Sequence, residues 1–200
     1  MHKELSGYGD HAQVTMQSNV AGTETMGIEG HYHVVCHDKD GNLKWEEKFP
    51  NLVVAVGKQL MLDTLLAGSS YTTVGPYLGL ISGTGNTFLA ADTMASKAWT
   101  EFSNYTVGGS AVRGTAVFAS ATSSGSSPSN VTTSTATAIT YTITGGGGTV
   151  GGCFLVTGSG ASSTIGNTSG TLYSAGDFAT AKVTTAGDTV SVTYSTTATS

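Results

Sequence analysis

Three histidines near the start of the chain are the first residues whose spacing could support chemistry. His31, His33 and His37 occupy odd positions of one short stretch, so on a β-strand their side chains would share a face. Two imidazoles two residues apart can bind zinc if a carboxylate such as Glu29 or Asp38 supplies a third ligand. Because the stretch lacks a complete ligand set, we predict a solvent-facing strand with no metal and no cofactor.

The segment after these histidines, residues 38–42, has Asp, Asp and Asn at alternate positions, as in the first half of a calcium-binding loop. Its glycine stands at the fourth position of the segment instead of the sixth, and no glutamate stands at the twelfth. The Asp40-Gly41 pair is instead a strong signal for a tight hairpin turn. We therefore predict a plain turn.

The remaining candidates for chemistry are weaker. Glycines 145–148 are not followed by Lys-Ser/Thr, so we interpret them as a hairpin turn and not as a phosphate-binding loop. The sequence has no Gly-x-Ser-x-Gly segment and no cysteine–histidine spacing typical of a nucleophile. Cys36 and Cys153 follow no motif, and we expect buried free thiols more than a disulfide. We assign no catalytic, cofactor-binding or metal-binding residue and predict that the protein is not an enzyme.

The histidines belong to a predicted hairpin over residues 27–49. Tyr32, Val34 and Cys36 alternate with them, which places these three side chains on the buried face.

The one convincing helix follows, over residues 56–66, where apolar side chains recur at helical spacing. A helix of about three turns is marginal alone, so it must pack on a sheet. We expect it to be the main cover of that sheet, with Leu60 and Leu65 buried.

Short apolar segments separated by glycine-rich turns predict further strands, at residues 74–81, 113–121, 136–144, 150–157, 171–178 and 189–196. Apolar residues make up 38% of the chain and charged residues 10%, which suits a thin sandwich with hydroxyl-rich outer faces. We predict a mainly β fold, an antiparallel β-sandwich of jelly-roll or immunoglobulin-like type, with one helix packed on the sheet.

Charge and hydropathy argue against two classes of partner. The net charge is -5 and only eight residues are Lys or Arg, so binding to nucleic acid is not expected. No apolar run is long enough to cross a membrane, and the first residues do not have the pattern of a secretory signal. We expect a protein made in the cytoplasm, with no membrane partner.

Residues 1–26 differ from the rest of the chain because they are polar, with only scattered apolar side chains. We predict that they form an extended N-terminal arm and that residues 27–200 form the sandwich domain. The arm either orders on a partner or is a frayed end.

Several short stretches resemble small structural proteins of tailed bacteriophages, a group that includes head decoration proteins and tail-associated β-sandwich proteins. The resembling stretches are Lys44-Trp45, Asn51 to Val53, Val56 to Lys58 with Leu62-Asp63, Tyr77 to Leu80, Ala91 to Ser96, Trp99 to Glu101 with Tyr105, Gly151 to Val156, Gly170 to Tyr173 and Gly187 to Tyr194. They cover most of residues 44–194 and leave residues 1–26 outside.

The resemblance implies a virion protein without a catalytic motif. We expect a decoration or cement protein that binds the major capsid protein and its own copies, as a dimer or trimer in the particle. The alternative is a tail or fibre component whose loops bind a host surface. A metal-dependent or carbohydrate-active enzyme is a third class, which the lack of recognisably paired carboxylates disfavours.

Overall fold

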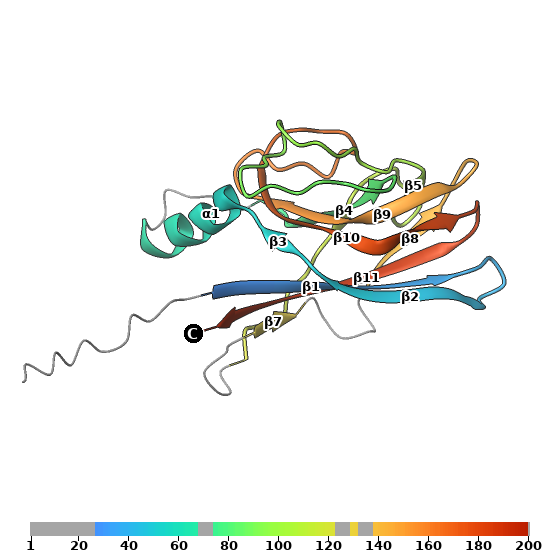
Figure 1. The fold of residues 1–200 in the computed structure, drawn as a ribbon, viewed down its shortest axis with the longest axis horizontal. Helices are drawn as coiled ribbons and strands as arrows, with labels where there is room; N and C mark the ends of the chain where they lie inside the picture. Colours follow the sequence, from blue (N-terminus) through green and yellow to red (C-terminus); the bar gives the residue numbers. More distant parts are fainter. Residues whose placement is uncertain (1–26, 68–73, 123–128, 132–137, 200) are drawn as a thin grey trace, which may run out of the picture.

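The computed structural model describes residues 27–67, 74–122, 129–131 and 138–199 (Figure 1). The predicted arm (1–26) and most of the Ser/Thr-rich segment 120–134 lie outside these residues. The elements, in chain order, are β1 (Gly27–His37), β2 (Leu43–Pro50), β3 (Leu52–Val53), α1 (Ala55–Leu66), β4 (Tyr77–Ser82), β5 (Tyr105–Thr106), β6 (Gly114–Thr115), β7 (Ser129–Val131), β8 (Ile139–Ile143), β9 (Gly148–Thr157), β10 (Thr171–Thr184) and β11 (Thr189–Thr199).

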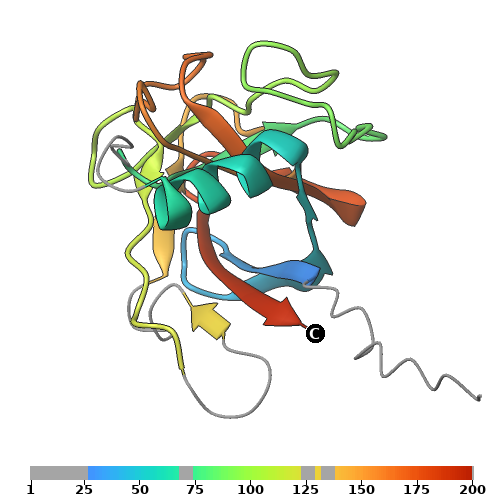
Figure 2. The same cartoon turned by 90° about the vertical axis from the view of Figure 1, so that its left-hand side faces the viewer.

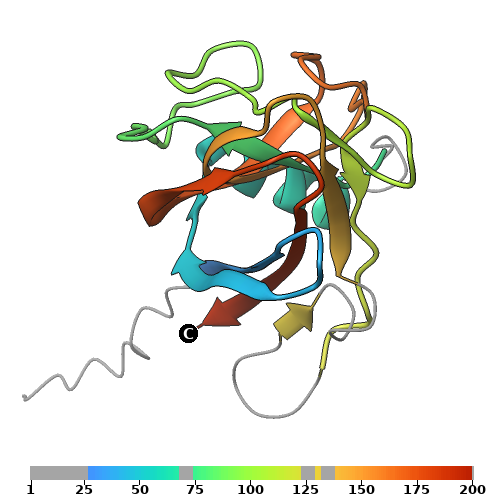
Figure 3. The same cartoon turned by 90° about the vertical axis from the view of Figure 1, so that its right-hand side faces the viewer.

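The strands form two antiparallel sheets that pack face to face, so the predicted mainly β sandwich is confirmed. Sheet A has the order β2-β1-β11-β8-β5, with β7 also paired to β11, and sheet B has the order β3-β10-β9-β4-β6. In Figure 1, strands β4, β9 and β10 lie above β1, β2 and β11, and Figure 3 shows the same two layers from one end.

The predicted hairpin is confirmed with its alternation. Strand β1 pairs with β2 on one side and with β11 on the other, and Tyr32 lies opposite both Phe49 and Tyr194. The side chains of Tyr32, Val34 and Cys36 are fully buried, whereas the histidines between them face outward and are half-buried. Period-two alternation therefore gives the correct inner face.

Buried tyrosines connect the two sheets through the core. Tyr32 and Tyr141 of sheet A reach sheet B, where the Tyr32 hydroxyl lies 2.9 Å from Ser174 Oγ and the Tyr141 hydroxyl donates to the Leu78 carbonyl at 2.7 Å. The hydroxyl of Tyr194 accepts a hydrogen bond from Asn51 Nδ2 at 2.9 Å. Each ring fills core volume, and each hydroxyl has a partner, which removes the cost of burying a polar group.

The outer face of sheet B carries a second apolar cluster. Strand β9 is buried along most of its length, because Cys153 and Leu155 join the core between the sheets while Phe154 and Val156 face the other way. Loop residues cover this outer face. Trp99 lies 5.0 Å from Phe154, ring centroid to centroid, and Met94 and Ala161 belong to the same cluster.

The helix is present, but the prediction that it is the main cover of the sheet is wrong. Its close contact with β10 is made through Gly57, where a Cβ atom would collide with the backbone of Tyr173. Leu65 and Leu66 are each 77% exposed, and Leu62 is 49% exposed. The loops around Trp99 take the place on the sheet that the sequence assigned to the helix leucines.

The glycines at 145–148 connect the two strands that the sequence predicts there, but those strands do not pair with each other. They join β8 of sheet A to β9 of sheet B, so this turn crosses between the sheets and is not a hairpin. Gly147 has φ of 74°, and a Cβ atom there would collide with the Thr184 carbonyl oxygen, so this turn requires glycine.

The two leucine environments give a direct test of this packing. Leu80→Ala removes a fully buried side chain, and we expect it to lower the free energy of unfolding by roughly 2–5 kcal/mol. Leu65→Ala should change it by less than about 0.5 kcal/mol in dilute solution, because the side chain is already in water. Urea unfolding of both variants measures the difference, and equal losses would contradict the placement of α1.

Candidate functional site

The predicted histidine face is a polar hollow on the outside of sheet A. His31 and His33 of β1 lie between β2 and β11, and the hollow has a volume of about 540 Å³. His33 Nε2 lies 2.7 Å from Glu46 Oε1. The other outward side chains at the hollow are those of Lys48, Thr193 and Ser195. This arrangement can offer donors and acceptors to a polar ligand in open solvent.

The histidines do not meet the carboxylates that the sequence offered as metal ligands. His37, Glu29 and Asp38 do not line the hollow, and the carboxylate beside His33 is Glu46 of the neighbouring strand. Within the described ranges, no three His, Cys, Asp or Glu side chains are placed to hold a metal ion. The sequence missed Glu46 because cross-strand register, and not sequence distance, brings it to β1.

Residues 38–42 form the predicted hairpin turn, which their hydrogen bonds explain. Asp38 Oδ1 accepts from the backbone N–H groups of Asp40 at 2.9 Å and Asn42 at 2.8 Å, and Asn42 Nδ2 donates to Asp38 Oδ2 at 3.0 Å. The hydrogen bond from the Asn42 side chain is the main reason that the pKa of Asp38 falls below its usual value. These oxygens accept bonds from the turn itself, as in an Asx-turn.

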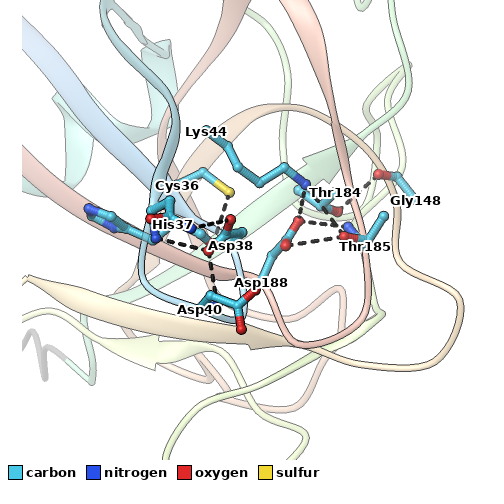
Figure 4. A network of polar contacts seen from close by, with 10 residues as sticks. Cys36, His37, Asp38, Asp40, Lys44, Gly148, Thr184, Thr185 and Asp188 are labelled. Carbon is cyan, nitrogen blue, oxygen red and sulfur yellow. Dashed lines mark hydrogen bonds and ion pairs between the residues drawn. The ribbon is translucent and has the colours of Figure 1, made fainter.

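A polar network next to this turn connects the hairpin to the β10–β11 connection (Figure 4). Lys44 Nζ lies 2.6 Å from Asp188 Oδ2, and the carboxylate also accepts from Thr185 N at 2.8 Å and Thr185 Oγ1 at 3.1 Å. Burial alone would raise the pKa of Asp188, but the hydrogen bonds from Lys44 and Thr185 outweigh it, and the pKa is lowered. The buried carboxylate therefore stays ionised and organises this connection.

A second network, around Arg113, holds the loops outside sheet B. Arg113 is 1% exposed, and its Nε and Nη2 atoms donate to the two oxygens of Glu101 at 2.8 and 2.7 Å. Nη1 donates to the Ser162 carbonyl and Nη2 also to the Asn167 carbonyl. Gly166 N donates to Glu101 Oε2 at 2.7 Å. The fork-shaped pair joins the segments around residues 101, 113 and 162–167, so its role is structural.

Both cysteines are buried and free, as predicted. Burial is the largest cause of the raised pKa of Cys36, about 11, and it also raises the pKa of Cys153 well above the usual thiol value. A thiol that stays protonated is a poor nucleophile and metal ligand. Neither residue therefore contributes a reactive group.

The least expected feature is an apolar groove beside α1, hereafter the α1 groove. Its widest part has a volume of about 460 Å³ and is lined by Leu60, Met61, Thr64, Leu65, Thr157 and Tyr173. Met61 also lines a small hollow with Ile28, Lys58 and Leu62, and Tyr173 lines another with Pro76 and Phe118. These hollows share side chains and so are contiguous.

Helix α1 lies at one end of the sandwich, where it crosses above the start of β1 and the end of β11 (Figure 2). The α1 groove is at this end because α1 residues line it. Sequence reasoning missed it because the leucines of α1 were assigned to the core. One signal was available: residues 60, 61, 62, 65 and 66 are all apolar and surround most of the helix, whereas a surface helix with one buried face has a narrower stripe. A single sheet cannot cover so wide an apolar surface.

Comparisons with models of protein families, with curated proteins and with solved structures each found no match. The resemblance to phage structural proteins therefore stays a prediction. In the part of the chain that the structure describes, no helix has both the length and the apolar character needed to span a bilayer.

The Arg113 network can be tested by removing one charge. Glu101→Gln leaves the buried guanidinium without its counter-charge, and we expect the free energy of unfolding to fall by roughly 3–5 kcal/mol. Glu46→Gln is the matched control, because Glu46 is 53% exposed beside His33 and should change stability by less than about 0.5 kcal/mol. Similar effects of the two substitutions in urea unfolding would show that the network does not hold the loops.

The expectation that folding needs no metal can be tested at the histidine hollow. We expect EDTA to leave the thermal midpoint unchanged, since His31 and His33 lack a third ligand among the described residues. The double variant His31→Ala/His33→Ala should respond as the natural chain does. A midpoint that drops in EDTA for the natural chain alone would establish a metal site.

Proposed function

We propose that this chain is a non-enzymatic structural protein of a tailed-bacteriophage particle. In this role it decorates or cements the capsid by binding the major capsid protein and copies of itself. Each bound copy would bury surface across its neighbours and so raise the free energy needed to separate them. The virion is its proposed location, after assembly in the host cytoplasm.

The observation that carries this proposal is the exposed leucine face of α1 beside the α1 groove. Leu62, Leu65 and Leu66 are three of the seven large apolar side chains that are exposed among the described residues. Apolar side chains gathered on one element, next to an apolar groove, are typical of a surface that binds another protein. A protein partner explains this face better than a polar small molecule does.

The charged side chains also support a structural role. Beyond residue 100, Glu101 pairs with Arg113, and Asp188 and Lys182 pair with residues of β2. The outward side chains of neighbouring strands in sheet A include Thr140 and Ser191, whose hydroxyl oxygens lie 3.2 Å apart. Charges that hold loops, together with hydroxyl-rich outer faces, suit a subunit packed among other subunits.

A tail or fibre component that binds a host surface is the second candidate. The polar hollow of His31, His33, Lys48 and Thr193 favours it, because hydroxyl, imidazole and ammonium groups can hydrogen-bond to a glycan or a protein loop. The two candidates differ in how many copies a particle needs.

Copy number separates the two. We expect the chain to be present in purified particles in a fixed ratio to the major capsid protein, because a decoration protein repeats with the lattice. A calibrated denaturing gel, with the major capsid and major tail proteins of the same particles as internal standards, measures this ratio. Only a few copies per particle would favour the tail or fibre role, and absence of the chain from particles would reject both.

A further inference from the structure

We propose that the α1 groove binds the N-terminal segment, residues 1–26, of a neighbouring copy of this chain. This inference rests on the proposed self-association and names the surface that would produce it. The groove supplies an apolar channel beside a helix, and the segment supplies the occupant.

The chemistry of the groove favours an occupant that can place apolar side chains against it. Leu60, Met61, Leu65 and Tyr173 supply most of its walls, and Thr64 and Thr157 supply the rest. The Tyr173 hydroxyl already donates towards Met61 Sδ at 3.3 Å, so the polar group of this wall is engaged within the chain. Burying such walls against apolar side chains is favourable in proportion to the apolar surface removed from water.

Residues 1–26 are polar overall, but they contain one short stretch with apolar side chains at alternate positions. Val14, Met16 and Val20 stand at even positions, so in an extended conformation they would share one face. Glu24 follows four residues later, and Lys58 lies at the edge of the groove in the hollow that it shares with Ile28 and Leu62. With Glu24 near Lys58, the attraction between the two charges would favour one orientation of the segment along the groove.

The length of the segment, and the place where it joins β1, allow a neighbouring copy to be its donor. Strand β1 is paired with β11 as far as Gly27, and Ile28 already lies against the near end of the groove. Extended, 26 residues span roughly 85 Å, about twice the roughly 40 Å diameter of a domain of this size. The segment is therefore long enough to reach the same groove of an adjacent copy.

Complementation between two full-length variants tests the proposal in the absence of particles. Val14→Glu/Met16→Glu places charges on the apolar face of the segment and leaves the groove intact. Leu65→Glu places a charge in the groove and leaves the segment intact. Light scattering during size-exclusion chromatography should show that the natural chain associates as its concentration rises and that each variant stays monomeric. An equimolar mixture of the two variants should associate again, because it contains one intact segment and one intact groove.

Matched controls keep the test specific. Leu43→Glu alters a leucine that is 58% exposed at the start of β2, outside the groove, and should associate as the natural chain does. Thr15→Glu adds a charge on the opposite face of the extended segment and should also retain association. Because Leu65 is exposed, Leu65→Glu should keep the natural melting temperature, and Leu62→Glu provides a second groove variant.

Several results would overturn the proposal. The natural chain could be monomeric at every concentration, or the segment and groove variants could associate as the natural chain does. The mixture of the two variants could also stay monomeric. A synthetic peptide of residues 1–26 that leaves an existing assembly intact at saturating concentration would also overturn it. The particle gel tests the virion role separately. If the chain is abundant in particles but the complementation fails, only the proposed binding of the segment to the groove is rejected.

Discussion

Tyrosines whose hydroxyls cross between the sheets are the constraint on which the rest of this sandwich depends. The chain has few large aliphatic side chains for its length, so Tyr32, Tyr141 and Tyr194 fill much of the core. Their hydroxyls must find partners there, since an unpaired buried hydroxyl costs about 1–3 kcal/mol. Burial is the main reason that the pKa of Tyr194 rises to about 12. The partners lie on sheet B or just before it, and Gly30 leaves room for Asn51 and the Tyr194 hydroxyl, so the tyrosines fix how one sheet sits on the other.

Buried charges fix what the tyrosines do not, namely the connections at the edges of the sheets. The Arg113–Glu101 pair gathers three loop segments over the outer face of sheet B, and the Lys44–Asp188 pair joins the first hairpin to the β10–β11 connection. In each pair the two charged side chains bond to one another, and further hydrogen bonds join the pair to backbone or hydroxyl groups. An ion pair tolerates burial under this condition. The charged side chains at these positions hold connections in place, which agrees with the proposed structural role in an assembly.

The helix shows how local pattern and tertiary packing can separate. Its sequence is apolar on most sides. Gly57 lets the helix approach β10 closely, and only part of the helix surface meets the sheet. Loop residues around Trp99 and Met94 cover the sheet instead. Leu65, which is left outside, then lines the α1 groove, where the proposed partner would supply the burial that the described residues do not.

The sequence by itself determined most of the longer elements and the inner face of the first hairpin, because strand alternation and turn chemistry are local properties. Tyr32, Val34 and Cys36 are buried as their spacing predicts, and residues 38–42 turn as their Asp and Gly residues predict. Five of the later strands, β4, β8, β9, β10 and β11, also lie where short apolar segments predict them, whereas residues 113–121 contribute only the two-residue strand β6. Tertiary structure alone decided the pairings between distant residues. Glu46 meets His33 through register, the 145–148 turn crosses between sheets, and Leu65 faces water while loop residues cover the sheet. These outcomes depend on which of several apolar surfaces packs at a given place in the core. The spacing of residues in the sequence does not specify that choice.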